Sequence, residues 1–400
     1  MKKIGFVTPW YGENIPGGAE MALRGVTEHL QAAGVELEIL STCVKEFGSE
    51  WDENFHKPGK TVENGMHVQR FPVKKRDRIK FDAVNMKLIC GQRISPKEEQ
   101  IFIDEIINSP ELYTYISEHE AEYDLFVYIP YMFGPVYYGI KACPKKAVMI
   151  PCFHDEAYVY MGIFRELYSK IAGMIFNSKS EQRLTNKIYD IAQMKQCVPG
   201  LGLETDLKYN AQAFRDKYQI PEPFILYAGR KDGGKNVGTL LRYFREFKMR
   251  NGGDLKLVLI GGGDILIPAD IQKDVRDLGF VDKQDKYDAY GAATVLCQPS
   301  KNESFSLVIM ESWLCERPVL VHGCCAVTRD FVIDAAGGLY FGSYYEFEEC
   351  IKKYLNDKEL ADTMGQNGKE FVLNNFKWDI VTNKYIQFFE EVIADRERKN

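Results

Sequence analysis

The stretch FILYAGRKDGGKNVGTLL, from Phe224 to Leu241, has the order of elements from which an α/β fold is built. An apolar run comes first, a glycine-bearing loop follows, and apolar residues then recur at helical spacing. The loop also satisfies the phosphate-loop pattern G-x-x-x-x-G-K through Gly229, Gly234 and Lys235. However, Asn236 stands where a nucleoside triphosphatase needs a Ser or Thr hydroxyl to hold magnesium. We therefore expect a phosphate site without triphosphatase chemistry.

The side chains of this loop suit a phosphate group. Arg230 offers a planar fork of donors, and Lys235 offers a compact positive charge. Gly233 and Gly234 allow backbone amides to approach a ligand, and the amino terminus of the following helix favours anions. A helix-capping turn with solvated charges is the alternative interpretation.

The same alternation of strand, loop and helix runs through the whole chain. Residues 4–8, the helical pattern up to Gly34 and the segment VELEILST form a strand, helix, strand unit. The pattern restarts after CVPGLGLETD (197–206), with further strands expected in segments that include LGFV (278–281). We predict two Rossmann-like, doubly wound domains at residues 1–200 and 205–377, and a helix at about 378–400 that packs back on the first. Ligands of such sheets collect at the carboxyl ends of the strands.

Composition limits the classes of function. The chain has 400 residues, 45% of them hydrophobic, and a net charge of -6, which argues against general affinity for nucleic acid. Its first residues, MKKIGFVTPW, hold too few apolar residues for a signal peptide, so we expect a cytoplasmic protein. The basic run VKKRDRIK (73–80) is either a solvated loop or a patch for anionic lipid or a phosphorylated acceptor. Peripheral contact with the inner face of a membrane therefore stays open.

A second group of candidate residues lies in PSKNESFSLVIMESWLCERPVLV, which begins at Pro299. Glu303 precedes a predicted helix, and Glu311 lies on its first turns, so both carboxylates can border one pocket. The free amides of Phe305, Ser306 and Leu307 would point at a bound phosphate. Taken alone, this spacing is also typical of a capping acid and a surface residue.

Two loops of the first domain are weaker candidates. His154 follows an apolar strand in PCFHDEAY, where it either bonds a substrate hydroxyl or serves the structure. Gly17 and Gly18, in GENIPGGAE, either bring backbone amides near a ligand or form a tight turn. The sequence offers no recognisable metal-ligand spacing.

In this order, the segments GGAE, FHD, IFNSKSEQRL, GRKDGGKN, LVLIGGG and CQPSKNESFSLVIMESWLCERPVLV resemble the retaining glycosyltransferases of family 4. The last segment matches the family motif E-x7-E with Glu303 and Glu311. The resemblance covers nearly the whole chain and implies the GT-B fold, in which two Rossmann-like domains face a central cleft. It departs from the family where many members have Gly-Phe-Gly after the first Glu, because Ser304, Phe305 and Ser306 stand there.

The resemblance also implies roles for the candidate residues. Arg230 and Lys235 would hold the diphosphate of a sugar nucleotide, Glu311 its ribose, and Glu303 the donor sugar. Ser304, Phe305, Ser306 and Leu307 would support the phosphate and sugar through their amides. His154 would lie beside the transferred sugar, and the loop with Gly17 and Gly18 would close over the reaction centre.

The activity implied is transfer of a hexose, from GDP-mannose or a UDP-hexose, to a glycan or lipid-linked saccharide in polysaccharide or glycolipid synthesis. No metal or other cofactor is expected. The alternatives are a sugar-nucleotide epimerase or a phosphorylase on a similar fold, and an inactive glycan-binding or scaffold homologue. The acceptor, the linkage and the oligomeric state do not follow from the sequence.

Overall fold

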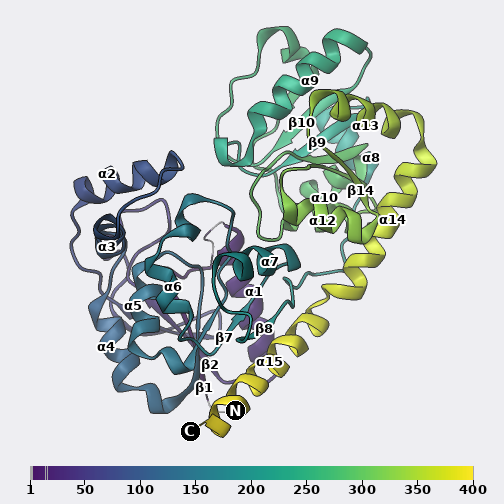
Figure 1. The fold of residues 1–400 in the computed structure, drawn as a ribbon. Coiled ribbons are helices and arrows are strands. Elements are labelled where there is room, and N and C mark those ends of the chain that lie inside the picture. Colours follow the sequence, from purple (N-terminus) through teal and green to yellow (C-terminus); the bar gives the residue numbers. More distant parts are fainter. Residues whose placement is uncertain (1–2, 14, 16, 400) are drawn as a thin grey trace. The chain divides into compact units, whose positions relative to one another are not determined.

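The computed structural model describes residues 3–13, 15 and 17–399, and it divides into two compact units (Figure 1). The first unit is Met1–Gly202 together with Trp378–Asn400, and the second is Leu203–Lys377. Each unit contains a parallel or mostly parallel sheet flanked by helices, which confirms the predicted α/β class with two doubly wound domains. The predicted loop GENIPGGAE includes Asn14 and Pro16, which lie outside the described residues.

The sheet of the first unit has the order β3-β4-β2-β1-β5-β6-β7-β8. Its neighbouring strands run parallel, except that β3 runs antiparallel to β4. Strand order reverses between β1 and β5, which is the switch point of this sheet. The strands are β1 (Lys3–Thr8), β2 (Leu37–Thr42), β3 (Gly59–Glu63), β4 (Met66–Phe71), β5 (Tyr123–Tyr128), β6 (Ala147–Met149), β7 (Gly173–Ile175) and β8 (Lys195–Cys197).

Alternating side chains of these strands fill two apolar layers, one on each face. Ile4 and Phe6 of β1 join the layer with α1 and α15, whereas Val7 joins the layer covered by the other helices. The helices of the unit are α1 (Gly18–Ala32), α2 (Arg78–Ile89), α3 (Pro96–Glu105), α4 (Pro110–Glu118), α5 (Gly134–Ala142), α6 (Ile163–Tyr168), α7 (Lys179–Ile188) and α15 (Trp378–Lys399).

The carboxy-terminal helix α15 belongs to the first unit. Trp378, its first residue, stacks on His29 of α1 with ring centroids 4.0 Å apart. A Cβ atom on Gly202 would lie 2.1 Å from the same indole ring, so the glycine allows a close approach. Further along, Val381 and Phe389 enter the apolar layer beside β1. The chain therefore leaves the first unit after Gly202 and returns to it at Trp378.

The sheet of the second unit is parallel throughout, in the order β11-β10-β9-β12-β13-β14. Its strand order reverses between β9 and β12. The prediction of a strand at LGFV is wrong, because residues 278–281 form a loop. The strand of this region is β11, which ends just before them. The strands are β9 (Phe224–Ala228), β10 (Lys256–Ile260), β11 (Val275–Asp277), β12 (Val295–Gln298), β13 (Val319–His322) and β14 (Gly338–Phe341).

Helices α9 and α13 cover one face of this sheet through residues such as Phe244 and Phe347. The remaining helices pack against one another, α10 on α8 and α11, and α14 on α11 and α12. The helices are α8 (Ala211–Tyr218), α9 (Val237–Asn251), α10 (Lys283–Ala292), α11 (Leu307–Leu314), α12 (Ala326–Ala335), α13 (Tyr344–Asn356) and α14 (Lys358–Asn375).

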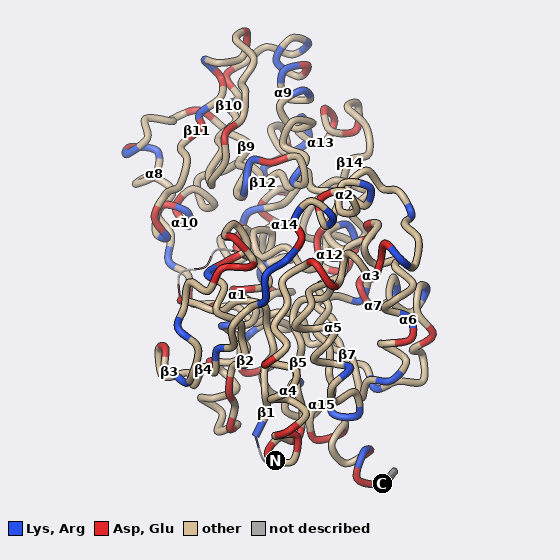
Figure 2. Tube along the Cα trace, turned by 90° about the vertical axis from the view of Figure 1, so that its left-hand side faces the viewer, with Lys and Arg blue, Asp and Glu red and all other residues tan. Residues whose placement is uncertain are grey.

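Short 3-10 helices complete the path of the chain. They are η1 (Glu120–Glu122), η2 (Pro144–Lys146), η3 (Ala157–Tyr160), η4 (Gly233–Lys235) and η5 (Ala269–Asp274). Basic and acidic residues are interspersed along the trace of both units (Figure 2). Among the residues that the structure describes, no helix has the length and apolarity needed to cross a membrane.

Candidate active site

Two glycines let the loop after β9 lie against the loop after β10. Gly229 has a φ of +150°, and a Cβ atom on Gly261, whose φ is +116°, would lie 2.1 Å from the Gly229 carbonyl oxygen. Lys231 is buried in the same loop, and its Nζ lies 2.6 Å from Oδ1 of Asp277. Packing and charge therefore both fix the backbone that leads to the predicted phosphate-binding residues.

Those residues follow in the 3-10 helix η4. Oδ1 of Asp232 accepts the backbone N–H of Lys235 at 3.0 Å and so caps this helix. Asn236 then adopts a left-handed conformation, with a φ of +57°, immediately before α9. The capping turn considered as an alternative is therefore present, and it also fixes the backbone of Lys235.

The loop after β12 leads into α11 through a strained residue. Ser306 has a φ of +79°, a region that favours glycine, and it precedes the first residue of the helix. Its buried Oγ has no hydrogen-bond partner within the described part of the chain. The Phe305 ring packs on Phe331 and Phe376, with centroids 5.3 and 5.0 Å away. The side chain of Phe305 thus anchors the loop at the amino terminus of α11. There the amide of Ile309 donates to the Ser306 carbonyl oxygen at 3.3 Å, and the amides before it precede the intrahelical ladder.

These two loops meet at the switch point of the second sheet. Nζ of Lys235 lies 2.7 Å from Oε1 of Glu303, with the two side chains 26% and 10% exposed. Nδ2 of Asn236 donates to the carbonyl oxygen of Pro299 at 2.9 Å. The structure therefore brings together two residues that were predicted to bind different parts of one donor.

Arg230 lies on the same loop but is much more open to solvent. Its side chain is 71% exposed, and its Nε lies 3.4 Å from Oδ2 of Asp232. The Arg230 carbonyl oxygen accepts a hydrogen bond from the Tyr227 hydroxyl at 2.6 Å, so the backbone is fixed although the guanidinium is exposed. Ser304 and Leu307, also predicted site residues, are half-buried beside Glu303 in sequence.

Glu311 is held by two residues of α10. Lys286 Nζ lies 2.7 Å from its Oε1, and the Tyr290 hydroxyl donates to its Oε2 at 2.9 Å. Burial and then the Glu311 charge raise the pKa of Tyr290 far above its usual value, so the hydroxyl stays a donor. Each carboxylate oxygen can accept a further hydrogen bond. Glu311 is therefore oriented and retains acceptor capacity.

In the first unit, His154 lies on the loop that follows β6. Its side chain is half-buried, and its Nδ1 is 3.7 Å from Oε1 of Glu156, which also accepts from the Tyr131 hydroxyl at 2.9 Å. Gly17 has a φ of +144° immediately before α1, and a Cβ atom there would lie 2.0 Å from Oε2 of Glu20. Gly18, by contrast, has open space around it. Only Gly17 needs to be glycine on these grounds.

Comparison with known proteins finds a family that is similar to the second unit. Residues 210–371 match the family of glycosyl transferases group 1. The second unit is therefore similar to the group 1 glycosyltransferases. Both units also resemble solved structures with the GT-B fold, so the predicted fold is confirmed. Sucrose-phosphate synthase from Thermosynechococcus elongatus aligns with a TM-score of 0.71 and 18% identity, over 99% of this chain and 100% of that one.

Two further proteins illustrate the range of proteins that this chain resembles. Anabaena HepE, solved in complex with UDP and glucose, aligns with a TM-score of 0.66 and 15% identity, over 98% of this chain and 100% of that one. A Campylobacter jejuni enzyme, N-acetylgalactosamine-N,N'-diacetylbacillosaminyl-diphospho-undecaprenol 4-alpha-N-acetylgalactosaminyltransferase, is 28% identical over 58% of this chain and 63% of its own. The chain spans between 23% and 63% of the lengths of the curated relatives that it matches.

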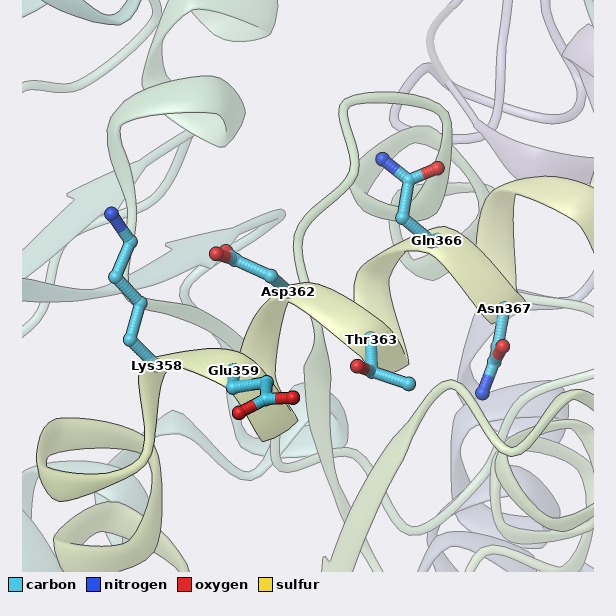
Figure 3. A pocket seen from close by; sticks show the side chains of 6 residues that line it. All are labelled: Lys358, Glu359, Asp362, Thr363, Gln366 and Asn367. Atoms are coloured by element: carbon cyan, nitrogen blue, oxygen red, sulfur yellow. The ribbon is translucent and has the colours of Figure 1, made fainter.

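A hollow on the surface of the second unit lies away from the residues above. It runs along α14, with a volume of about 570 Å³, and polar side chains line it (Figure 3). Its lining residues are Lys358, Glu359, Asp362, Thr363, Gln366 and Asn367. None of them is a predicted site residue, and most are exposed. We therefore assign the candidate site to the switch point, where the loops after β9 and β12 meet through the part-buried pair of Lys235 and Glu303.

Several residues that shape the site were not singled out from the sequence. The order D-G-G-K is a capping signal that could have identified Asp232. The order S-K-S-E is a capping signal that could have identified Glu181 of the first unit. Lys286 and Tyr290 are four residues apart on one face of α10. Nothing in their spacing connects them with Glu311, since that contact is made only by the packing of α10 on α11.

Proposed function

We propose that the protein is a retaining glycosyltransferase that moves a hexose from a nucleoside diphosphate sugar to a glycan or lipid-linked acceptor. The observation that carries the proposal is the meeting of Lys235, Glu303 and the amino terminus of α11 at the switch point. A cation and helix amides suit a diphosphate, and a carboxylate beside them suits sugar hydroxyls. GDP-mannose and UDP-hexoses are the donors proposed, for polysaccharide or glycolipid synthesis in the cytoplasm.

The proposed reaction places charge where this chain has matching groups. The bond between the anomeric carbon and the diphosphate oxygen breaks, and negative charge builds on the diphosphate. Lys235, Arg230 and the α11 amides stabilise that charge, so the proposal includes no metal ion. The acceptor hydroxyl attacks from the face of the leaving group and gives its proton to the diphosphate, which retains the anomeric configuration.

Donor binding must change the contact between Lys235 and Glu303. The ammonium group has three N–H donors, so it can turn toward a phosphate oxygen while remaining near the carboxylate. Glu303 then accepts hydrogen bonds from hydroxyls of the donor sugar. The unpartnered hydroxyl of Ser306 is buried at the start of α11, where it can donate to the same phosphate.

Glu311 supplies the proposed contact with the ribose. Its carboxylate is held by Lys286 and Tyr290, which leaves lone pairs that can accept from the two ribose hydroxyls. The amides of Ser304, Phe305 and Leu307 complete the donor side in the proposal. The Phe305 side chain has a structural part, because it is buried against other aromatic rings.

On the acceptor side, we assign His154 to a contact with the transferred sugar, and the Gly17 and Gly18 loop to closure over the reaction centre. The solved complex of HepE with UDP and glucose supports a sugar nucleotide as donor. The name of the Campylobacter jejuni relative specifies a diphospho-undecaprenol substrate, which supports a lipid-linked saccharide among the acceptors to be tested.

The test is isothermal titration calorimetry of the protein with GDP, UDP, ADP and dTDP in the absence of magnesium. We expect one diphosphate to bind and the Lys235→Ala variant to bind it about tenfold more weakly, the loss expected for one charge-assisted hydrogen bond. Lys358→Ala is the matched control, since that lysine lies on α14 away from the switch point.

The outcomes separate the alternatives. Unchanged affinity in Lys235→Ala would show that this loop does not bind the diphosphate. If the wild-type protein binds none of the four diphosphates, the proposal of a transferase gives way to that of a glycan-binding or scaffold homologue. Transfer of radiolabelled hexose to a lipid extract then tests the acceptor class.

A further inference from the structure

A buried carboxylate in the first unit has no part in the proposed chemistry. Glu181, on the first turn of α7, is 1% exposed. Its Oε1 accepts the backbone N–H of Phe153 at 2.7 Å, and its Oε2 accepts that of Asn177 at 2.7 Å. One side chain thus binds the loop after β6 and the loop after β7, which are neighbouring strands.

The loop that Glu181 holds is strained. Cys152 has a φ of +57°, although it is not a glycine, and it directly precedes Phe153. A left-handed conformation of this kind costs about 1 to 2 kcal/mol and persists only where the surrounding contacts enforce it. Two contacts do so here: the Phe153 N–H bond to Glu181, and a hydrogen bond from Asn177 Nδ2 to the Cys152 sulfur at 3.5 Å.

We propose that Glu181 is a positioning residue whose carboxylate fixes the loop of residues 151–156 and thereby the place of His154. The kinetic part of this inference rests on the proposed function, because it takes His154 to lie beside the transferred sugar. The structural part does not depend on that function. It predicts that loss of the carboxylate releases the backbone next to His154.

The strength of this contact changes near neutral pH. Burial raises the pKa of Glu181 to about 7, against the opposing effects of the Asn177 and Phe153 amides, of His154 and of the Ser178 amide. Cys152 and Tyr385 of α15 are the other titratable groups whose charges couple to it. The ionised carboxylate accepts both amides with full strength, whereas a proton on either oxygen weakens one bond. The loop is therefore held most firmly above this pH.

The structural test follows the backbone amide resonances of Phe153 and Asn177 by NMR between pH 5.5 and 8.5. In the wild-type protein, both should titrate together with a midpoint near 7, and in Glu181→Gln neither should. Glu99→Gln is the matched control, because Glu99 is also buried and accepts two backbone amides, those of Gly162 and Ile163, each at 2.8 Å. That variant should keep the joint titration.

The kinetic test compares the same variants with the donor identified by calorimetry. Glu181→Gln should lower kcat by about tenfold to a hundredfold, the effect of a misplaced group near the reacting atoms, and should flatten the acid limb of the kcat profile. Diphosphate affinity should stay within twofold of the wild type, because the proposed phosphate site lies in the second unit.

The two proposals fail separately. Identical amide titrations in the wild type and Glu181→Gln would overturn the positioning role whatever the activity is. A joint titration that disappears in Glu181→Gln supports the positioning role even in a protein that transfers no sugar. Should Glu181→Gln not fold, Glu181→Asp, which keeps the charge but shortens the reach, must lose at least one of the two amide titrations.

Discussion

Nζ of Lys235 and Oε1 of Glu303 lie 2.7 Å apart, although the two residues are 68 positions apart in the chain. One follows β9 and the other follows β12, and strand order reverses between these two strands. The pair therefore occupies the place where parallel α/β sheets collect ligands. A cation predicted to bind phosphate and a carboxylate predicted to bind sugar neutralise each other in the ligand-free protein.

Removing the charge of Glu303 should free Lys235 for the diphosphate. We expect Glu303→Gln to bind the nucleoside diphosphate about threefold to tenfold more tightly, since a partly exposed ion pair is worth about 1 kcal/mol. Sugar transfer should fall in the same variant because the carboxylate contact is lost. Calorimetry and a transfer assay measure the two effects.

Glu349→Gln is the control for this experiment. Glu349 pairs with Lys352 on the exposed side of α13, so the same change of charge occurs away from the switch point. Weaker diphosphate binding by Glu303→Gln would mean that Glu303 supports the phosphate site rather than competing with it.

Ser306→Gly should change stability and affinity in opposite directions. Glycine relieves the left-handed strain at φ +79°, which should raise the free energy of unfolding by up to about 1 kcal/mol. Loss of the buried hydroxyl should weaken diphosphate binding about fivefold, the equivalent of one neutral hydrogen bond. Urea denaturation and calorimetry provide the measurements, and higher affinity in the variant would remove the hydroxyl from the proposed site.

The raised pKa of Glu181 should make the protein less stable as pH rises. Burial raises the pKa of this carboxyl from 4.5 to about 7, so the folded state binds more protons than the unfolded state between these values. The free energy of unfolding should therefore fall as pH rises through this window, by on the order of 3 kcal/mol from this group.

Urea denaturation at pH 5 and pH 8 measures the contribution of Glu181 when the free energies of unfolding of the wild type and Glu181→Gln are compared. Relative to Glu181→Gln, the wild-type protein should be less stable at pH 8 than at pH 5. Glu99→Gln should keep the wild-type dependence, since Glu181 remains in that variant. A constant difference between the wild type and Glu181→Gln at both pH values would contradict the expectation.

The basic run of residues 73–80 gives a prediction about membranes. If it contacts anionic lipid, replacing the exposed Lys74 and Lys75 by Ala should weaken the free energy of binding to phosphatidylglycerol vesicles by about 2 kcal/mol, near 1 kcal/mol per lysine. Sedimentation with the vesicles measures this loss. Arg76 should be left intact, because its guanidinium lies over the rings of Trp51 and Phe81, 5.0 and 4.9 Å from their centroids. The expected solvated loop is only part of this run, because its last residues, from Arg78, belong to α2. Equal sedimentation of variant and parent, or none by either, would remove the proposed contact with lipid.

Sequence periodicity was sufficient for the α/β fold and for the position of the loops that carry the candidate site residues. Apolar runs that end at Gly or Pro predict the carboxyl ends of parallel strands, so Lys235 and Glu303 were both expected near strand ends. Periodicity failed for β11, because this strand has only three residues and LGFV beside it is more apolar. It also could not show that Lys235 and Glu303 touch, since strand order is not encoded in local spacing.

The other site residues could not be predicted from the sequence because their contacts depend on how the helices pack. Tyr290 and Lys286 reach Glu311 only because α10 lies against α11. The strain at Ser306 likewise depends on where Phe305 is buried, although the family's glycine at this position was an indication of it. The roles proposed for His154, Gly17 and Gly18 involve residues of the first unit, and they remain predictions.

The second unit is one unbroken stretch of chain whose two ends meet. Leu203 pairs with Lys377, and its N–H donates to the Phe376 carbonyl oxygen at 2.8 Å. Gly202 and Trp378 are likewise in contact on the other side of the boundary. Residues 203–377 can thus be excised as a cassette, and a few residues can close the gap left behind. Exchange of this cassette between relatives would need no new junction inside either sheet, so it would test which unit determines the choice of donor.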